Sequence, residues 1–269
     1  MQVPCYAART PPHNKLLAAL PATDWERVAP SLRPVKLRPG EVIYEPGATL
    51  DYLVFPSSAI VSLVYLLADG GSAELAVVGN DGAVGIALFM GGGTTLSRAV
   101  VQSGGSGYRL MAHVLRREFG RGEEFQHLLL RYAQALLTQV AQTAVCNRHH
   151  SIDQQLCRWL LLTLDRLPSA EISMTQELIA NMLGVRREGI TDAAGKLQRA
   201  GLIHYSRGHI HVLDRAQLEC RCCECYAVVR RESDRLLPPP AGRAVRLPAV
   251  DQAPRSRRYG FAEAALGTG

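Results

Sequence analysis

The chain has 269 residues, of which 47% are hydrophobic, and it carries a formal net charge of +6 at pH 7. This length fits two domains of ordinary size, and the apolar content is sufficient to build their cores. No apolar run is long enough to span a bilayer, and residues 1–12 lack the apolar core of a secretory signal. We therefore expect a cytoplasmic protein with no membrane partner, whose positive charge suits a polyanionic ligand.

Short apolar runs separated by glycine and proline dominate residues 32–111, after a short helical stretch at 14–29. The runs occupy residues 35–37, 42–44, 52–55, 60–67, 73–78, 98–102 and 108–111. Many short strands at close spacing, punctuated by turn residues, are typical of an antiparallel barrel or roll. We predict that residues 14–117 form an N-terminal antiparallel β-roll of the jelly-roll kind.

From Glu118 to Val145 the apolar residues follow a helical period. One face carries Phe125, Leu129, Tyr132, Leu136 and Val140, and the other carries Leu128, Ala133, Leu137, Ala141 and Ala144. A helix with two apolar faces needs two surfaces to bury them. The roll can supply one surface. The second is either the same helix of another subunit, as in a coiled coil, or a further part of the same chain.

A helix, turn, helix and hairpin pattern occupies residues 175–213, after an amphipathic helix predicted at 151–164. Thr175 suits a helix N-cap, Gly184 permits the tight turn, and Gly201 ends the second helix. Residues 202–205 and 209–212 pair as a wing. Residues expected in the core are Leu178, Ile179 and Met182 of the first helix and Ile190, Ala194 and Leu197 of the second. We predict a winged helix-turn-helix domain at 147–215, a shape that fits the DNA major groove.

The start of the second helix carries the side chains best placed to reach bases. Arg186 and Arg187 can donate paired hydrogen bonds to guanine, and Glu188 can accept one from cytosine. Other candidates for contact with DNA are Thr175, Gln176, Thr191, Lys196 and Arg207. The alternative for these arginines is a solvated helix face. Because helix-turn-helix proteins usually bind in pairs, the motif favours a homodimer and assigns residues 118–146 as its dimerisation helix.

Residues 14–235 resemble the Crp/Fnr family of bacterial transcription regulators. The resemblance rests on PGEVIYEPG at 39–47, SIDQQLCRWLLLTLDRL at 151–167 and TQELIANMLGVRREGIT at 175–191. It implies a cyclic-nucleotide-binding-type roll, base reading by Arg187 and Glu188, and three partners: a double-stranded DNA operator, RNA polymerase and a small-molecule effector. Asp192 stands where the family often has a further arginine, which predicts a different DNA target.

The ligand loop departs from the family pattern, in which Gly-Glu-x-Ala-Leu holds a ribose and a later arginine holds the cyclic phosphate. Here the loop reads Gly85-Ile86-Ala87-Leu88, and Arg98-Ala99 lies near the arginine position. Because Ile86 replaces the expected glutamate and cannot accept a hydrogen bond from ribose, we do not expect cAMP to bind. The effector is then another molecule, or there is none.

Four of the seven cysteines are concentrated in one short segment, at Cys220, Cys222, Cys223 and Cys225. Thiolates at this density can bind zinc, copper(I) or an iron–sulfur cluster. The C-x-C-C-x-C spacing lacks the two-residue gaps of a zinc knuckle, however, and an odd cysteine count favours free thiols. We therefore expect residues 216–269 to form a C-terminal helix with free thiols and a disordered tail. His149 and His150 are expected to be exposed hinge residues.

These patterns predict an α+β fold and a homodimeric, DNA-binding transcription regulator. Nucleophile elbows, HExxH motifs and paired-carboxylate helices are absent from the sequence, so an enzyme is not expected. Two alternatives from other classes stay open. One is an effector-binding module that docks a protein instead of DNA, and the other is a thiol-based metal or redox sensor.

Overall fold

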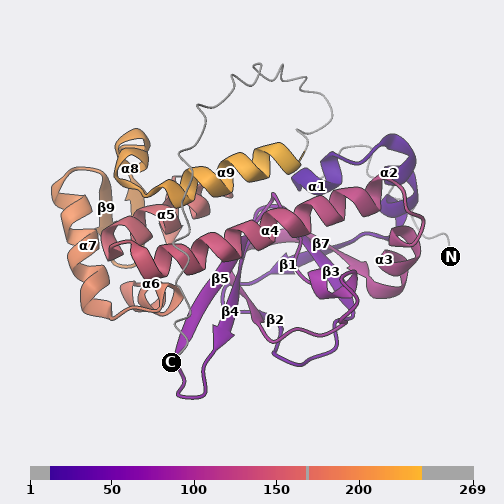
Figure 1. The fold of residues 1–269 in the computed structure, drawn as a ribbon, viewed down its shortest axis with the longest axis horizontal. Coiled ribbons are helices and arrows are strands. Elements are labelled where there is room, and N and C mark those ends of the chain that lie inside the picture. Colours follow the sequence, from indigo (N-terminus) through magenta and orange to yellow (C-terminus); the bar gives the residue numbers. More distant parts are fainter. Residues whose placement is uncertain (1–12, 168–169, 238–269) are drawn as a thin grey trace, which may run out of the picture.

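A computed structural model describes residues 13–167 and 170–237 of the chain. It has an N-terminal β-roll, a long helix across the middle of the molecule, and a helix-turn-helix domain at one end (Figure 1). The predicted α+β fold class is confirmed. Among the residues described, no helix is long and apolar enough to cross a membrane. The tail expected after Leu237 lies outside the described residues.

The roll consists of two antiparallel sheets. Strands β1 (Arg33–Leu37), β7 (Gly105–Met111) and β3 (Tyr52–Pro56) form one sheet in the order β1-β7-β3. Strands β2 (Val42–Tyr44), β6 (Arg98–Ser103), β4 (Ile60–Leu66) and β5 (Ser72–Val78) form the other in the order β2-β6-β4-β5. Short helices α1 (Lys15–Ala18) and α2 (Ala22–Val28) lead into the roll, followed by a 3-10 turn at Ala29–Ser31. Each strand corresponds to one of the predicted apolar runs.

The helix predicted from Glu118 is two helices in the structure, α3 (Ala112–Phe119) and α4 (Glu124–His149). The chain turns between them at Gly122, whose φ of 74° is a left-handed conformation that favours glycine. Glu118 belongs to α3, where its buried carboxylate accepts a hydrogen bond from Arg27. The long helix therefore begins at Glu124, later than the apolar period suggested.

Three surfaces of α4 differ in what covers them. The first packs on the roll, where the buried Tyr132 hydroxyl donates to the Ala83 carbonyl at 2.8 Å. A second faces helix α9 (Glu224–Leu236), which runs along α4 (Figure 1). Leu128 and Ala133, which belong to the second of the two predicted apolar faces, are buried within this chain. The third surface leaves Leu137 56% exposed.

The C-terminal domain follows α4. Its elements are α5 (Ile152–Leu164), β8 (Glu171–Ser173), α6 (Gln176–Leu183), α7 (Arg187–Arg199), β9 (Ile203–Ser206), β10 (His209–Val212) and α8 (Arg215–Arg221). The three strands form an antiparallel sheet in the order β8-β10-β9. Strand β8 was not predicted, because three residues are too short for a period to be recognised.

The C-terminal domain and the roll share a hydrophobic core. Ile60 of β4 and Val77 of β5 belong to the same buried cluster as Trp159 of α5. An ion pair joins the two parts as well, with Nη2 of the buried Arg166 2.8 Å from Oδ2 of the partly exposed Asp81. Helix α6 also contacts β5. The position of the helix-turn-helix motif is therefore set by contacts with the roll in this conformation.

Candidate nucleic-acid interface

Helix α6 begins and ends as the sequence predicted. The Thr175 side chain accepts a hydrogen bond from the Leu178 amide at 3.3 Å, and Gly184 terminates the helix with φ 65°. The buried face differs from the expectation, because Leu178 is 46% exposed. Ile179, Ala180 and Leu183 fill the core instead, so the buried stripe is rotated away from Leu178.

Helix α7 buries one stripe and leaves the opposite face open. Its buried residues are Ile190, Ala193, Ala194 and Leu197, at the spacing of one helix face. Gly189 allows α7 to approach α5, since a Cβ atom there would lie 2.7 Å from Cδ1 of Ile152. The α7 backbone is thus held against α5, and the exposed face points away from the domain core.

The first turn of α7 presents Arg186, Arg187 and Glu188, all exposed. None of the three forms an ion pair with another residue that the structure describes. Arg186 is the N-cap residue, and α7 begins at Arg187. Two guanidinium groups and a carboxylate are therefore free to contact an external partner at the end of the helix.

The neighbouring candidates differ in how freely they can bind DNA. Thr191 lies beside Gln176, with its Oγ1 donating to Gln176 Oε1 at 2.7 Å, so α6 and α7 are joined at this face. Lys196 is less available, because its Nζ lies 2.8 Å from Asp192 and 3.3 Å from Asp153. The hydrogen bonds that the Lys196 ammonium donates to Asp192 and Asp153 raise the pKa of Lys196.

The wing turns through two residues with left-handed backbone, Arg207 with φ 49° and Gly208 with φ 82°. Positive φ at both positions is the conformation of a tight two-residue hairpin. Arg207 is exposed at the tip. The Met174 amide donates to the Gly208 carbonyl at 2.7 Å, which places the wing beside the start of α6. Thr175 and Arg207 thus flank the same face of the domain.

The candidate effector residues do not gather around one site. A cavity of about 150 Å³ between the roll and α4 is lined by Ile86 and Ala87, together with Tyr44, Leu136 and Val140, which the sequence did not indicate. Gly85, with φ 109°, precedes the 3-10 turn Ile86–Leu88, in which Leu88 is buried. Ala99 is buried in β6.

Arg98 is engaged by a different partner. Its guanidinium donates to Glu45 from Nε at 2.8 Å and from Nη2 at 3.0 Å, in a paired arrangement. It is not among the residues that line the cavity. The polar groups that do line the cavity include Tyr44, whose burial raises its pKa to about 12. The neutral hydroxyl groups of Tyr44, Thr95 and Ser97 and a larger number of aliphatic side chains therefore line this cavity.

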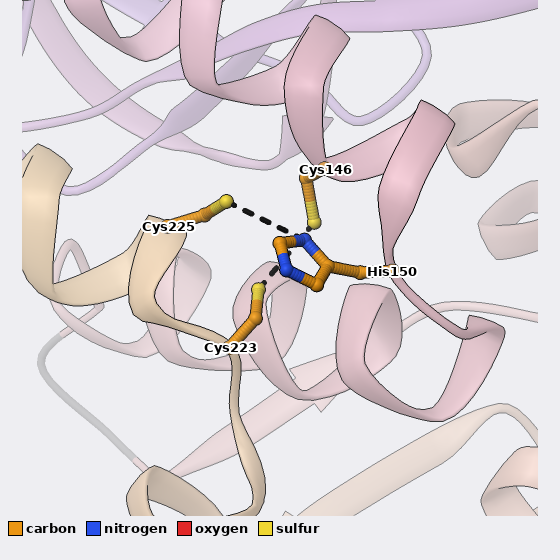
Figure 2. A group of neighbouring side chains, drawn as sticks. All are labelled: Cys146, His150, Cys223 and Cys225. Atoms are coloured by element: carbon orange, nitrogen blue, oxygen red, sulfur yellow. Dashed lines mark hydrogen bonds between the residues drawn. The ribbon is translucent and has the colours of Figure 1, made fainter. Parts of the chain in front are cut away.

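The cysteine segment does not form one continuous helix. Helix α8 ends before Cys222, and α9 begins after Cys223, so the four cysteines do not converge as a set. Cys220 is exposed, while Cys223 and Cys225 point toward the end of α4 (Figure 2). There they meet Cys146 and His150, and these four could hold a metal ion.

This arrangement corrects one expectation. His150 is not an exposed hinge residue, since only 14% of its side chain is accessible. The described cysteines are free, as expected, but hydrogen bonds from Cys146 and Cys222 lower the pKa of Cys223. In the sequence Cys146 and His150 are one helical turn apart, but this pair alone is not a recognisable metal motif.

Comparison with known proteins was made for the sequence and for the fold. Residues 154–221 match the family model of the Crp-like helix-turn-helix domain. No curated protein is similar to the chain in sequence. Among solved structures, FixK2 from Bradyrhizobium japonicum is 16% identical, with a TM-score of 0.61 over 71% of this chain and 98% of that one. A CRP-family transcriptional regulator from Thermus thermophilus is 22% identical, with a TM-score of 0.59 over 70% and 95%.

Proposed function

Because the chain has the fold of the Crp/Fnr transcription regulators and contains a Crp-like helix-turn-helix domain, we propose that it binds DNA in a sequence-specific manner as a homodimer and regulates transcription. The observation that carries the proposal is the exposed first turn of α7. Arg186, Arg187 and Glu188 have no ion-pair partner among the described residues, on a helix whose other face is fixed in the core.

In the proposed complex α7 lies in the major groove. Arg187 donates to guanine O6 and N7, Glu188 accepts from a cytosine amino group, and Arg186 reaches an adjacent base or phosphate. Thr175 and Gln176 at the start of α6, Thr191 of α7 and Arg207 of the wing contact the backbone or base edges. Lys196 contributes less than its charge suggests, because Asp192 and Asp153 compete for its ammonium group.

The exposed stripe of α4 supports the homodimer. Leu130, Leu137 and Val145 are 44%, 56% and 44% exposed, and exposed Ala141 and Ala144 lie between them. Pairing of this stripe with its copy buries apolar surface and presents two α7 helices. Two such helices fit half-sites separated by one DNA turn, about 34 Å.

A Leu137→Glu substitution tests the dimer. It places a charge in the proposed interface, so sedimentation analysis should show a monomer with weakened DNA binding. Leu67→Glu is the matched control, because Leu67 is 55% exposed at the β4–β5 hairpin, far from α4 in sequence. A Leu137→Glu chain that remains as dimeric as the control contradicts the proposed interface.

The cavity between the roll and α4 supports a small, mainly apolar effector rather than cAMP. Ile86 offers no acceptor for a ribose hydroxyl, and Glu45 already neutralises Arg98. The same cavity is lined by Leu136 and Leu137 of α4. A ligand there would contact the proposed dimer helix, and it would act by favouring one arrangement of the two subunits.

Selection of binding sites from random double-stranded DNA, followed by affinity measurements at several salt concentrations, tests DNA recognition. Arg187→Ala should relax preference at one base position by about 1–3 kcal/mol. Arg207→Ala should instead reduce the slope of log affinity against log salt concentration by about one, as expected for the loss of one phosphate contact, and leave base preference unchanged. Arg235→Ala is the control, because Arg235 lies on α9 and pairs with Glu232.

A chain that enriches no DNA sequence at low salt refutes the proposal and favours the protein-docking alternative. RNA polymerase is the protein partner that we propose for the DNA-bound dimer. Its recruitment is measured separately, with purified polymerase on the selected DNA, so that failure to bind DNA and failure to recruit polymerase remain distinct results.

A further inference from the structure

Four side chains that commonly bind metals converge where α4 ends and α9 begins (Figure 2). Cys146 and His150 are one turn apart on α4 and so share a face of the helix. Cys223 and Cys225 lie on either side of the first residue of α9. The three cysteines are buried, at 5% exposure or less. We propose that these residues form a zinc site. This proposal holds whether or not the chain binds DNA.

Distances between the ligand atoms fit a single ion. Cys146 Sγ lies 3.6 Å from Cys223 Sγ, and Cys225 Sγ lies 3.6 Å from His150 Nδ1. Zinc bonds of about 2.3 Å to sulfur and about 2.0 Å to nitrogen, arranged as a tetrahedron, place two sulfurs about 3.8 Å apart and nitrogen about 3.5 Å from sulfur. All four ligand atoms lie within 4.8 Å of one another, so small side-chain movements complete the geometry.

The same distances favour a single zinc ion over an iron–sulfur cluster or a disulfide. An iron–sulfur cluster distributes its four protein ligands over two or more irons and therefore needs some ligand atoms farther apart than the 4.8 Å found here. A disulfide needs a sulfur–sulfur distance of about 2.05 Å, whereas Cys146 and Cys223 are free thiols at 3.6 Å. Three thiolates and one imidazole in a closed tetrahedral site are typical of structural zinc. Each thiol that binds releases a proton, and no oxidant is required.

A carboxylate lies beside the second ring nitrogen of His150, an arrangement common for histidines that bind metals. Glu224 Oε2 is 3.3 Å from His150 Nε2, which leaves Nδ1 for the metal. The backbone is held as well, since Gln155 Nε2 donates to the His150 carbonyl at 2.9 Å. The imidazole is thus oriented before any ion arrives.

The zinc would join two points that are distant in sequence. Cys146 and Cys223 are 77 residues apart, and the chain between them contains α5 through α8, with the whole helix-turn-helix motif. Because the four ligands come together only in the folded chain, zinc would bind the folded state preferentially and stabilise it. The ion would therefore fix both ends of the C-terminal domain to the end of α4.

Metal analysis of the full-length, reduced protein tests the site. After incubation with zinc and dialysis, about one zinc per chain is expected, and cobalt added to the metal-free chain should give the visible and thiolate charge-transfer bands of a tetrahedral site. Cys146→Ser and Cys225→Ser should lose the metal. Cys220→Ser should retain it, because Cys220 is exposed and outside the cluster.

Glu224→Gln tests whether the carboxylate orients His150 for metal binding. This substitution should weaken metal affinity by about 10–100-fold while zinc still binds. Thermal melts should show zinc stabilising the natural chain and Cys220→Ser but not Cys146→Ser. Absence of thiolate–cobalt bands in the natural chain overturns the proposal, however the variants fold. Full zinc retention in Cys146→Ser and Cys225→Ser overturns it as well.

Discussion

Two glycines in α7 should respond to the same substitution in opposite ways. A methyl group at Gly195 would meet only Arg199 Nη1, at 3.4 Å, and that side chain is exposed and can move. Gly195→Ala should therefore raise the free energy of unfolding by about 0.8–1 kcal/mol through helix propensity. At Gly189 the methyl would lie 2.7 Å from Ile152 Cδ1. Overpacking typically costs about 1–3 kcal/mol, so Gly189→Ala should lower stability by up to about 2 kcal/mol.

A second substitution isolates the contact responsible. Ile152→Val removes Cδ1, and the next Ile152 atoms lie 3.9 and 4.0 Å from the new methyl, which is ordinary packing distance. In that background Gly189→Ala should become stabilising by about 0.8–1 kcal/mol. Urea denaturation at one fixed protein concentration measures the cycle, because the stability of a dimer depends on concentration. Equal stabilisation at Gly189 and Gly195 in the natural chain would show that α7 does not approach α5 this closely.

Three further predictions concern the roll, the thiols and the hinge. Burial raises the pKa of Glu74 above its usual 4.5, so the folded chain loses stability as the pH rises from 4.5 toward the folded-state pKa. Gln at this position does not titrate, so in thermal melts the Tm of Glu74→Gln relative to the natural chain should increase between pH 4 and 8. Burial also raises the pKa of Cys157 to about 12, so maleimide at pH 8 should label exposed Cys220 well before Cys157, as measured by peptide mass spectrometry. Ser151→Ala removes the capping box of α5 and should cost about 1 kcal/mol in urea denaturation.

Local patterns were sufficient for most of the fold. The strands of the roll were recognisable because each is bounded by turn residues, such as Gly40 and Gly47, which adopt left-handed backbone. Thr175 and Gly184 marked α6 for the same reason, through cap chemistry that depends only on neighbouring residues. The start of α4 was placed too early, because the apolar period continues through Glu118 although Gly122 turns the chain.

What the sequence did not reveal depends on contacts between distant segments. Leu178 has the apolarity of a core residue, and only the packing of α6 shows that Ile179 and Leu183 face inward instead. The metal cluster combines a helical pair, Cys146 and His150, with cysteines more than 70 residues later, so neither half is a recognisable motif by itself. The cavity below Ile86 likewise exists only because α4 closes it.

In the proposed regulator, the core that Trp159 shares with Ile60 and Val77 would limit how an effector signal reaches α7. With a flexible linker the C-terminal domain could change its orientation freely, but here its core residues pack directly against side chains of the roll. If an effector reorients α7, we expect the motion to be shear, with α5 sliding over β4 and β5 while apolar contacts are exchanged. A fragment cut after His150 would expose the indole of Trp159 to water, so severing the chain there should yield an aggregation-prone domain rather than an autonomous one.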